Sequence, residues 1–103
     1  MPRFKIKRKV CGQAAHSCFK PNKVPMTQLQ QVVLLADEFE ALRLVDFVGM
    51  QQQEAANQMG VSRQTLANIV KTARFKVVDC LTHGKALIIQ PINQDNDNDC
   101  STT

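Results

Sequence analysis

The sequence predicts a mainly α-helical domain built on a helix-turn-helix, with a small two-stranded β element from its N- and C-terminal segments. Three observations support this prediction. Apolar residues recur at helical spacing in two stretches, a glycine-containing turn separates the stretches, and the apolar residues are mainly Leu, Val, Ile, Ala and Met, without Trp or Tyr. At 103 residues the chain can bury one sizeable core, so we expect one domain.

The chain divides into three segments by composition. Residues 1–25 contain prolines and no helical period, so we expect a basic arm there, with a short extended piece near 8–11 or 17–20. Residues 26–92 hold the helical domain, which begins with a short helical turn after Pro25. Residues 93–103 are polar and of low complexity, so we expect a disordered tail.

A first long helix is predicted over residues 37–48. Asp37 is the expected N-cap, and Glu38 and Glu40 lie in the first turn, where their charges oppose the helix dipole. Gly49 is the expected end. The apolar side chains at helical spacing are Leu35, Phe39, Leu42 and Val45.

The helix-turn-helix is predicted at residues 51–81. Residues 51–59 form a helix with Ala55, Ala56 and Met59 on one face, and the helix ends at Gly60, a residue that adopts the left-handed conformation at low cost. Ser62 caps the next helix, which runs from about Arg63 to about Leu81. Its apolar stripe consists of Leu66, Ile69, Val70, Ala73, Val77, Cys80 and Leu81.

A strand is predicted after the second motif helix. Gly84 ends the helix, and residues 85–92 read as a strand. A lone strand needs a partner, and the extended N-terminal piece is the available one.

The outer face of the second motif helix carries the residue types that major-groove recognition uses. These residues are Arg63, Gln64, Asn68 and Lys71, with Ala67 between them and Thr65 at the edge. A small residue at Ala56, a glycine turn and a capped second helix are the features that a helix-turn-helix requires. We therefore expect double-stranded DNA as the partner, with Arg63, Gln64 and Asn68 at base edges and Ser62, Thr65 and Lys71 near phosphates.

The charge distribution agrees with a polyanionic partner. The net charge is +4, and residues 1–23 carry Lys and Arg but no acid. Basic segments at 1–23 and 59–85 flank an acidic middle. We expect the arm to follow the DNA backbone or enter a minor groove through Arg3, Lys5, Lys7, Arg8 and Lys9.

Several segments resemble one known family. "MPR" at the start, "FKP" at 19–21, "VVLLADEFEALRLVD" at 32–46 and "QEAANQMGVSRQTLANIVKTARFKVVDCLTHGKAL" at 53–87 resemble the uncharacterised bacterial and archaeal family called domain of unknown function 134, or uncharacterised protein family 0251. The resemblance implies a small DNA-binding protein whose helix-turn-helix is similar to the promoter-reading domain, region four, of sigma factors. The resemblance therefore implies a class of partner, and together with the motif it leads us to expect a transcriptional regulator. The family often has Ser at the start of the first motif helix, where this chain has Gln51.

The sequence also bears on two other functional classes, a protein-docking module and an enzyme. In the alternative, the VVLL segment at 32–35 and the acidic helix 37–48 dock a protein such as polymerase or a second subunit, with only non-specific DNA affinity. An enzyme is not expected, because the sequence contains no nucleophile elbow, P-loop or zinc-protease motif. A single motif reads few bases, so specific binding predicts a homodimer or a partner protein.

Cofactors and membrane segments are not expected. Cys11, His16 and Cys18 are zinc-ligand types, with His83 or Cys80 as a possible fourth ligand, but their spacing matches no common knuckle, so no metal is predicted. Cys80 is expected in the core. The longest apolar run is too short to span a bilayer, and no secretory signal follows the basic start, so a cytoplasmic protein is predicted.

Overall fold

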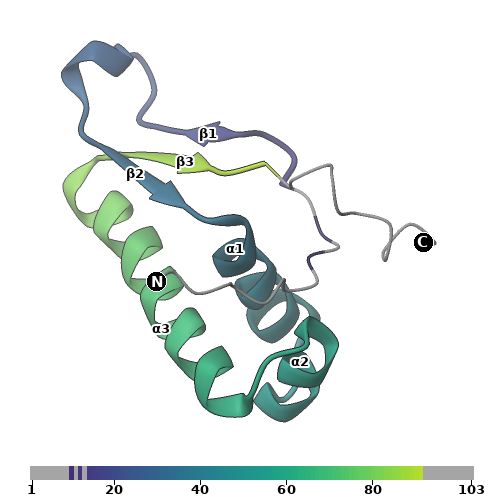
Figure 1. The fold of residues 1–103 in the computed structure, drawn as a ribbon. Coiled ribbons are helices and arrows are strands. Elements are labelled where there is room, and N and C mark those ends of the chain that lie inside the picture. The colour runs from purple at the N-terminus through teal and green to yellow at the C-terminus, as the bar shows by residue number, and fades with distance from the viewer. Residues whose placement is uncertain (1–9, 11, 13, 92–103) are drawn as a thin grey trace, which may run out of the picture.

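The structure, a computed structural model, describes residues 10, 12 and 14–91. The elements in chain order are β1 (Cys18–Phe19), the 3-10 turn η1 (Met26–Gln28), β2 (Gln31–Leu34), α1 (Ala36–Leu42), the π-helical η2 (Arg43–Val48), α2 (Gln52–Met59), α3 (Arg63–His83) and β3 (Ala86–Ile89). Helices predominate in this part of the chain (Figure 1), which confirms the predicted mainly α fold. Of the predicted arm at 1–25, residues 1–9, 11 and 13 lie outside the described residues, whereas Cys18–Phe19 form β1; the predicted tail at 93–103 also lies outside them.

The sheet contains one strand more than the sequence predicted. Its order is β1-β3-β2, with β3 antiparallel to β1 and parallel to β2. Ile88 at the centre pairs with Cys18 on one side and Val33 on the other. The predicted pairing of the terminal segments is thus confirmed, whereas the VVLL segment proves to be mostly a strand as well.

The helix predicted over 37–48 forms as α1 followed by η2, and it ends at Gly49, where φ is +90°. The prediction of Asp37 as N-cap was wrong. Leu35 holds that position because β2 runs directly into the helix, and its backbone N–H donates to Glu38 Oε1 at 2.9 Å. Glu38 therefore makes the N3 half of a capping box by accepting the N-cap N–H, while the Leu35 side chain caps no N–H of the first turn.

The helix-turn-helix consists of α2, a turn and α3. Ala55, Ala56 and Met59 are fully buried, as predicted, and they pack in one core with Leu66 and Val70 of α3. The small side chain of Ala56 permits a close approach of the two helices. The prediction of Leu81 as part of the buried stripe was wrong: its side chain is 79% exposed, because Cys80 takes the buried position one residue earlier.

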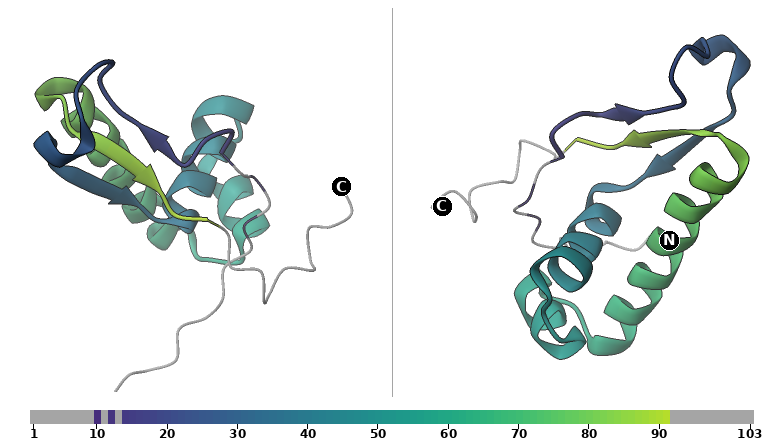
Figure 2. Two further views of the ribbon diagram at one scale, coloured as in Figure 1. Left: turned by 90° about the horizontal axis from the view of Figure 1, so that it is seen from above. Right: turned by 180° about the vertical axis from the view of Figure 1, so that it is seen from behind.

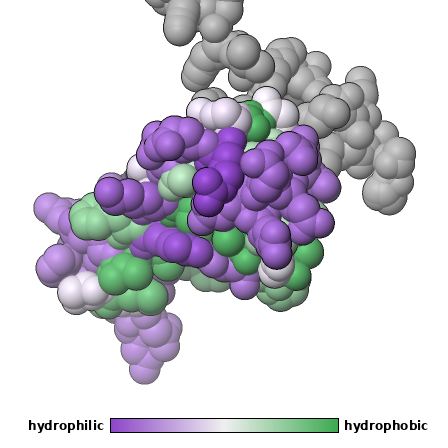
Figure 3. Space-filling model, turned by 90° about the horizontal axis from the view of Figure 1, so that it is seen from below, coloured by the Kyte–Doolittle hydropathy of each residue, from purple (hydrophilic) through white to green (hydrophobic). Residues whose placement is uncertain are grey.

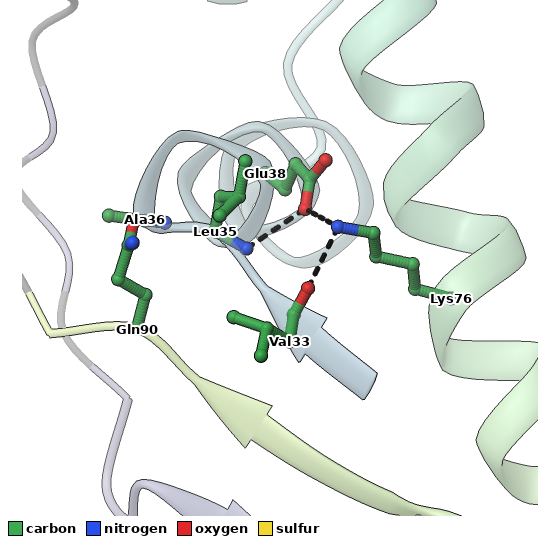
Figure 4. A network of polar contacts seen from close by, with 6 residues as sticks. All are labelled: Val33, Leu35, Ala36, Glu38, Lys76 and Gln90. Carbon is green, nitrogen blue, oxygen red and sulfur yellow. Dashed lines mark hydrogen bonds and ion pairs between the residues drawn. The ribbon is translucent and has the colours of Figure 1, made fainter. Parts of the chain in front are cut away.

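A polar network joins the sheet to both α1 and α3 (Figure 4). Lys76 Nζ donates to Glu38 Oε1 at 2.7 Å and to the Val33 carbonyl at 2.8 Å. Glu38 also accepts the Leu35 N–H, and the N–H of Ala36 donates to the Gln90 side chain at 3.0 Å. The outer edge of β2 at Val33 and Leu35 is therefore hydrogen-bonded by side chains instead of standing open.

The sheet and the helix-turn-helix lie at opposite ends of α3. Figures 1 and 2 show the three strands beside the C-terminal end of α3, with α2 beside its N-terminal end and α1 between. The N-terminal half of α3 is thus held by α2 and η2. No helix among residues 14–91 is both long and apolar enough to cross a membrane.

Candidate nucleic-acid interface

The turn into α3 is built as the sequence predicted. Gly60 adopts φ +72°, a left-handed conformation that glycine accepts without strain. Ser62 is the N-cap: its Oγ accepts the Thr65 N–H at 3.1 Å and lies 3.0 Å from Thr65 Oγ1. Ser62 and Thr65, both predicted near phosphates, therefore also fix the direction in which α3 begins.

Four predicted DNA-binding side chains lie on the outer surface of α3, within residues 63–71 at its N-terminal end. Arg63, Gln64, Asn68 and Lys71 are all exposed, and within the described part of the chain none of them forms a side-chain hydrogen bond or ion pair. Leu66 and Val70 on the opposite side are fully buried. The helix is thus anchored on one side and presents unpaired donors and amides on the other. We call these four residues the reading face.

Most other cations of the helical region are paired. Arg43 bonds Glu40 through two nitrogens at 2.9 Å, and Arg74 bonds Asp46 in the same manner at 3.0 and 2.7 Å. Lys76 pairs with Glu38, as described above, and Lys85 Nζ lies 2.9 Å from Asp79 Oδ2. Arg63 and Lys71 are therefore the cations of α3 that remain available to an external anion, among the residues that the structure describes.

The surroundings of the reading face are polar. Hydrophilic side chains cover most of the end of the molecule at which α2 turns into α3 (Figure 3). Gln53 and Asn57 of α2 are bonded to one another there at 3.0 Å. A hydrophilic face with unpaired cations suits a hydrated polyanion better than an apolar ligand.

Contacts and burial also shift the pKa values of three side chains away from the reading face. The hydrogen bond from Arg74 lowers the pKa of Asp46, and the bonds to Lys85 and then His83 lower the pKa of Asp79. Burial raises the pKa of the Cys80 thiol, as expected for a core cysteine. Asp46 and Asp79 form ion pairs and Cys80 is a core residue, so each shift has a structural cause.

One of the first described residues of the predicted arm is hydrogen-bonded to the helical domain. The Gly12 N–H donates to Glu40 Oε1 at 2.9 Å, and the Glu40 side chain is completely buried. A Cβ at residue 12 would overlap the Arg43 side chain, so glycine is the residue that fits. The five arm cations Arg3, Lys5, Lys7, Arg8 and Lys9 lie outside the described residues, so their predicted role stays a prediction.

Two of the carboxylates on the acidic helix proposed for protein docking are internal, although Asp46, Phe47 and Val48 at its end are exposed. Glu38 is 7% exposed and Glu40 is fully buried, and both accept hydrogen bonds from neighbouring elements. Of the VVLL segment, Leu34 is buried in the sheet, while Val33 and Leu35 remain partly exposed. Glu38 and Glu40, which the alternative function would use to dock a protein, therefore stabilise the fold through internal hydrogen bonds.

The candidate zinc ligands have other contacts where they are described. His16 packs edge-to-face on Phe19 with ring centroids 6.1 Å apart, His83 bonds Asp79 at 2.9 Å, and Cys80 is buried. Within residues 14–91 no group of three or more His, Cys, Asp or Glu side chains could hold a metal ion. Cys11 is outside this range.

The comparisons with known proteins agree along nearly the whole chain. Residues 1–95 match the family described as "Protein of unknown function DUF134". A UPF0251 protein of Aeromonas salmonicida is 69% identical over 99 residues, covering 96% of this chain and 97% of that protein. A UPF0251 protein of Vibrio cholerae is 64% identical over 93 residues, covering 90% and 95% respectively. No solved structure matches. None of these names states an activity, and the chain belongs to the uncharacterised DUF134 family, also called UPF0251.

Proposed function

We propose that this protein binds double-stranded DNA through the reading face of α3 and regulates transcription. One observation carries the proposal. Arg63 and Lys71, which pair with no acid in the described part of the chain, stand beside the amides of Gln64 and Asn68 on the exposed side of a capped helix. This is the combination of groups that a helix uses in a major groove.

The four side chains contact different groups of the DNA. Arg63 reaches guanine acceptors, and Gln64 and Asn68 reach adenine, because bidentate geometry distinguishes these bases in the major groove. Lys71 lies two turns from the helix start and contacts a phosphate, as the hydroxyl of Thr65 does. The arm cations at residues 3–9 follow the backbone or enter a minor groove.

The experiment separates base reading from charge attraction. Bound sequences are first selected from a random duplex pool, and affinities for a selected and a scrambled duplex are then measured by fluorescence anisotropy. Replacing Arg63 or Asn68 with Ala should cost about 1–3 kcal/mol on the selected duplex and much less on the scrambled one. Lys71→Gln should weaken both equally and lower the slope of log affinity against log salt by about 0.9.

A charge-matched control is available at the opposite end of the molecule. Lys23 is exposed and belongs to the segment between β1 and η1, and this segment lies at the end of the sheet away from α2 (Figure 1). Lys23→Gln removes the same charge and should leave affinity and salt slope nearly unchanged. Equal losses from Lys23→Gln and Lys71→Gln, or no binding to any duplex at low salt, would refute the proposal.

A further inference from the structure

Gly12 attaches the N-terminal segment to the middle of α1. Its N–H donates to Glu40 Oε1 at 2.9 Å, and Arg43 Nε donates to the same oxygen at 2.9 Å. The Glu40 carboxylate is completely buried, so these donors offset its loss of hydration. A hydrogen bond to a charged acceptor is about twice as strong as one between neutral groups. We call the contact among Gly12, Glu40 and Arg43 the arm anchor.

The arm anchor fixes the place of the backbone as well as attaching it. A Cβ at residue 12 would overlap the side chain of Arg43, so the backbone of Gly12 lies directly against that side chain. Only a residue without a Cβ permits so close an approach. The chain therefore meets α1 at one defined point, where glycine is required by space.

The arm anchor is attached to the same core as the reading face. Ala41 follows Glu40 directly and is completely buried, and Leu44 follows Arg43 directly and is also buried. Ala41 and Leu44 pack in one cluster with Leu66 of α3, whose opposite side carries the reading face. A close-packed core transmits little relative movement between its elements. Gly12 therefore holds a fixed position relative to the reading face.

We propose that the arm anchor positions the basic arm on the DNA, an inference that rests on the proposed function. Lys9 precedes Gly12 by three positions, and Arg3 precedes it by nine. At about 3.6 Å for each extended residue, their Cα atoms are at most about 11 and 32 Å from Gly12. The arm anchor thus limits the arm to phosphates near the bases that the reading face contacts.

The size of the effect follows from the length of chain that the arm anchor removes. Without it, a bond farther along the segment, from the Ile89 N–H to the Ser17 carbonyl at 2.8 Å, would hold the chain. Lys7, in the middle of the arm, is five residues from Gly12 and ten from Ser17. The effective concentration of a tethered group falls with about the 3/2 power of the tether length. Doubling the tether therefore weakens binding by the arm about threefold.

The first test measures the affinity of the full chain for the selected and scrambled duplexes in two backgrounds. Gly12→Ala breaks the arm anchor with one methyl group, and it should weaken binding to both duplexes about threefold. When the five arm cations are replaced with Gln, the same substitution should have no effect, because the arm no longer binds phosphate. Lys76→Met is the matched control. It breaks a largely buried ion pair that does not include Gly12, so the affinity of the folded protein should stay unchanged.

A second test keeps the arm anchor intact and does not depend on the folding of the Gly12→Ala chain. Inserting Gly-Ser-Gly-Ser between Lys9 and Val10 lengthens the tether of Lys7 from five to nine residues and should weaken binding about two- to threefold. The same insertion between Ala15 and His16, which are both exposed, lies beyond Gly12 from the arm. It should leave binding unchanged, because the arm still begins at Gly12.

Three results would overturn the inference: an unchanged affinity after Gly12→Ala, equal losses from Gly12→Ala in the two backgrounds, or equal effects of the two insertions. Equal losses would mean that the substitution acts through the fold. Any of these results leaves the proposed function standing when Arg63→Ala still narrows the difference between the two duplexes. A wild-type chain that binds no duplex at low salt would refute the proposed function and this inference together.

Discussion

Replacing Lys76 with Met should destabilise the domain without touching the reading face. The substitution keeps the aliphatic length of the side chain and removes the ammonium that bonds Glu38 at 2.7 Å and the Val33 carbonyl at 2.8 Å. The side chains of Lys76 and Glu38 are 23% and 9% exposed. The mutation therefore leaves a nearly buried carboxylate without its cation and a strand edge with an unpaired carbonyl.

The size of the effect follows from this burial. Breaking a fully buried pair costs about 3–5 kcal/mol, and because Lys76 keeps some contact with water we expect about 2–3 kcal/mol. For a domain of this size each kcal/mol lowers the melting temperature by about 4–8 °C, so the midpoint should fall by roughly 8–24 °C.

Urea unfolding followed by far-UV circular dichroism measures the change, since the chain has no Trp or Tyr to report by fluorescence. Lys71→Met is the matched control: it makes the same chemical change on the same helix, at an exposed lysine with no partner among the described residues. It should change stability by less than about 0.5 kcal/mol. Equal losses from the two substitutions would show that the reasoning about Lys76 is wrong.

Three smaller perturbations test other contacts. Gly12→Ala should destabilise the domain by about 1–3 kcal/mol in the same urea assay, because the added methyl displaces Arg43 from its bidentate pair with a buried carboxylate; no loss would contradict that packing. Gln51→Ser should raise stability by about 0.5–1 kcal/mol, since the present N-cap of α2 makes no side-chain bond, and an unchanged midpoint would count against this. Arg74 lowers the pKa of Asp46, so the stability from that pair is present above the unfolded carboxyl pKa of about 4 and is lost as the pH falls through the lower folded value; urea midpoints between pH 6 and 2 should fall less steeply for Asp46→Asn, and parallel curves would refute the assignment.

Local signals in the sequence were sufficient for the helix-turn-helix. Gly60 ends α2 through its own backbone conformation, and Ser62 caps α3 through one bond to a residue three positions later. Both effects are local, so these roles can be inferred without knowing the rest of the fold. The buried Ala55, Ala56 and Met59 followed from helical spacing in the same way. The Glu40–Arg43 pair, three residues apart on one helix, was also detectable by spacing.

Contacts between distant segments were beyond these signals. The VVLL segment is a strand only because β3 lies beside it, with Val33 paired to Ile88 more than fifty residues later. Short apolar runs suit a strand and a buried helix equally well, so periodicity could not decide. The Lys76–Glu38 and Arg74–Asp46 pairs likewise join separate elements, and no spacing in the sequence predicts them.

The pairing of most cations with acids limits the number of phosphates that the helical region could neutralise in the proposed function. Within the basic stretch at 59–85, acids from other elements or from the helix itself pair with Arg74, Lys76 and Lys85, which among the described residues leaves Arg63 for a base edge and Lys71 for a phosphate. One phosphate contact gives a slope of only about −0.9 for log affinity against log salt. A steeper slope in the full chain must then come mainly from residues outside this stretch.

The arm holds five cations between residues 3 and 9, and in the proposed function these are the charges that a steeper slope would require. Replacing its five cations, Arg3, Lys5, Lys7, Arg8 and Lys9, with Gln should make the slope shallower by about 0.9 for each phosphate that is no longer neutralised, and should weaken selected and scrambled duplexes alike. Arg63→Ala in the same titrations should instead narrow the difference between the two duplexes. A slope that is unchanged after all five replacements would mean that the arm contacts no phosphate, and that the reading face binds DNA without it.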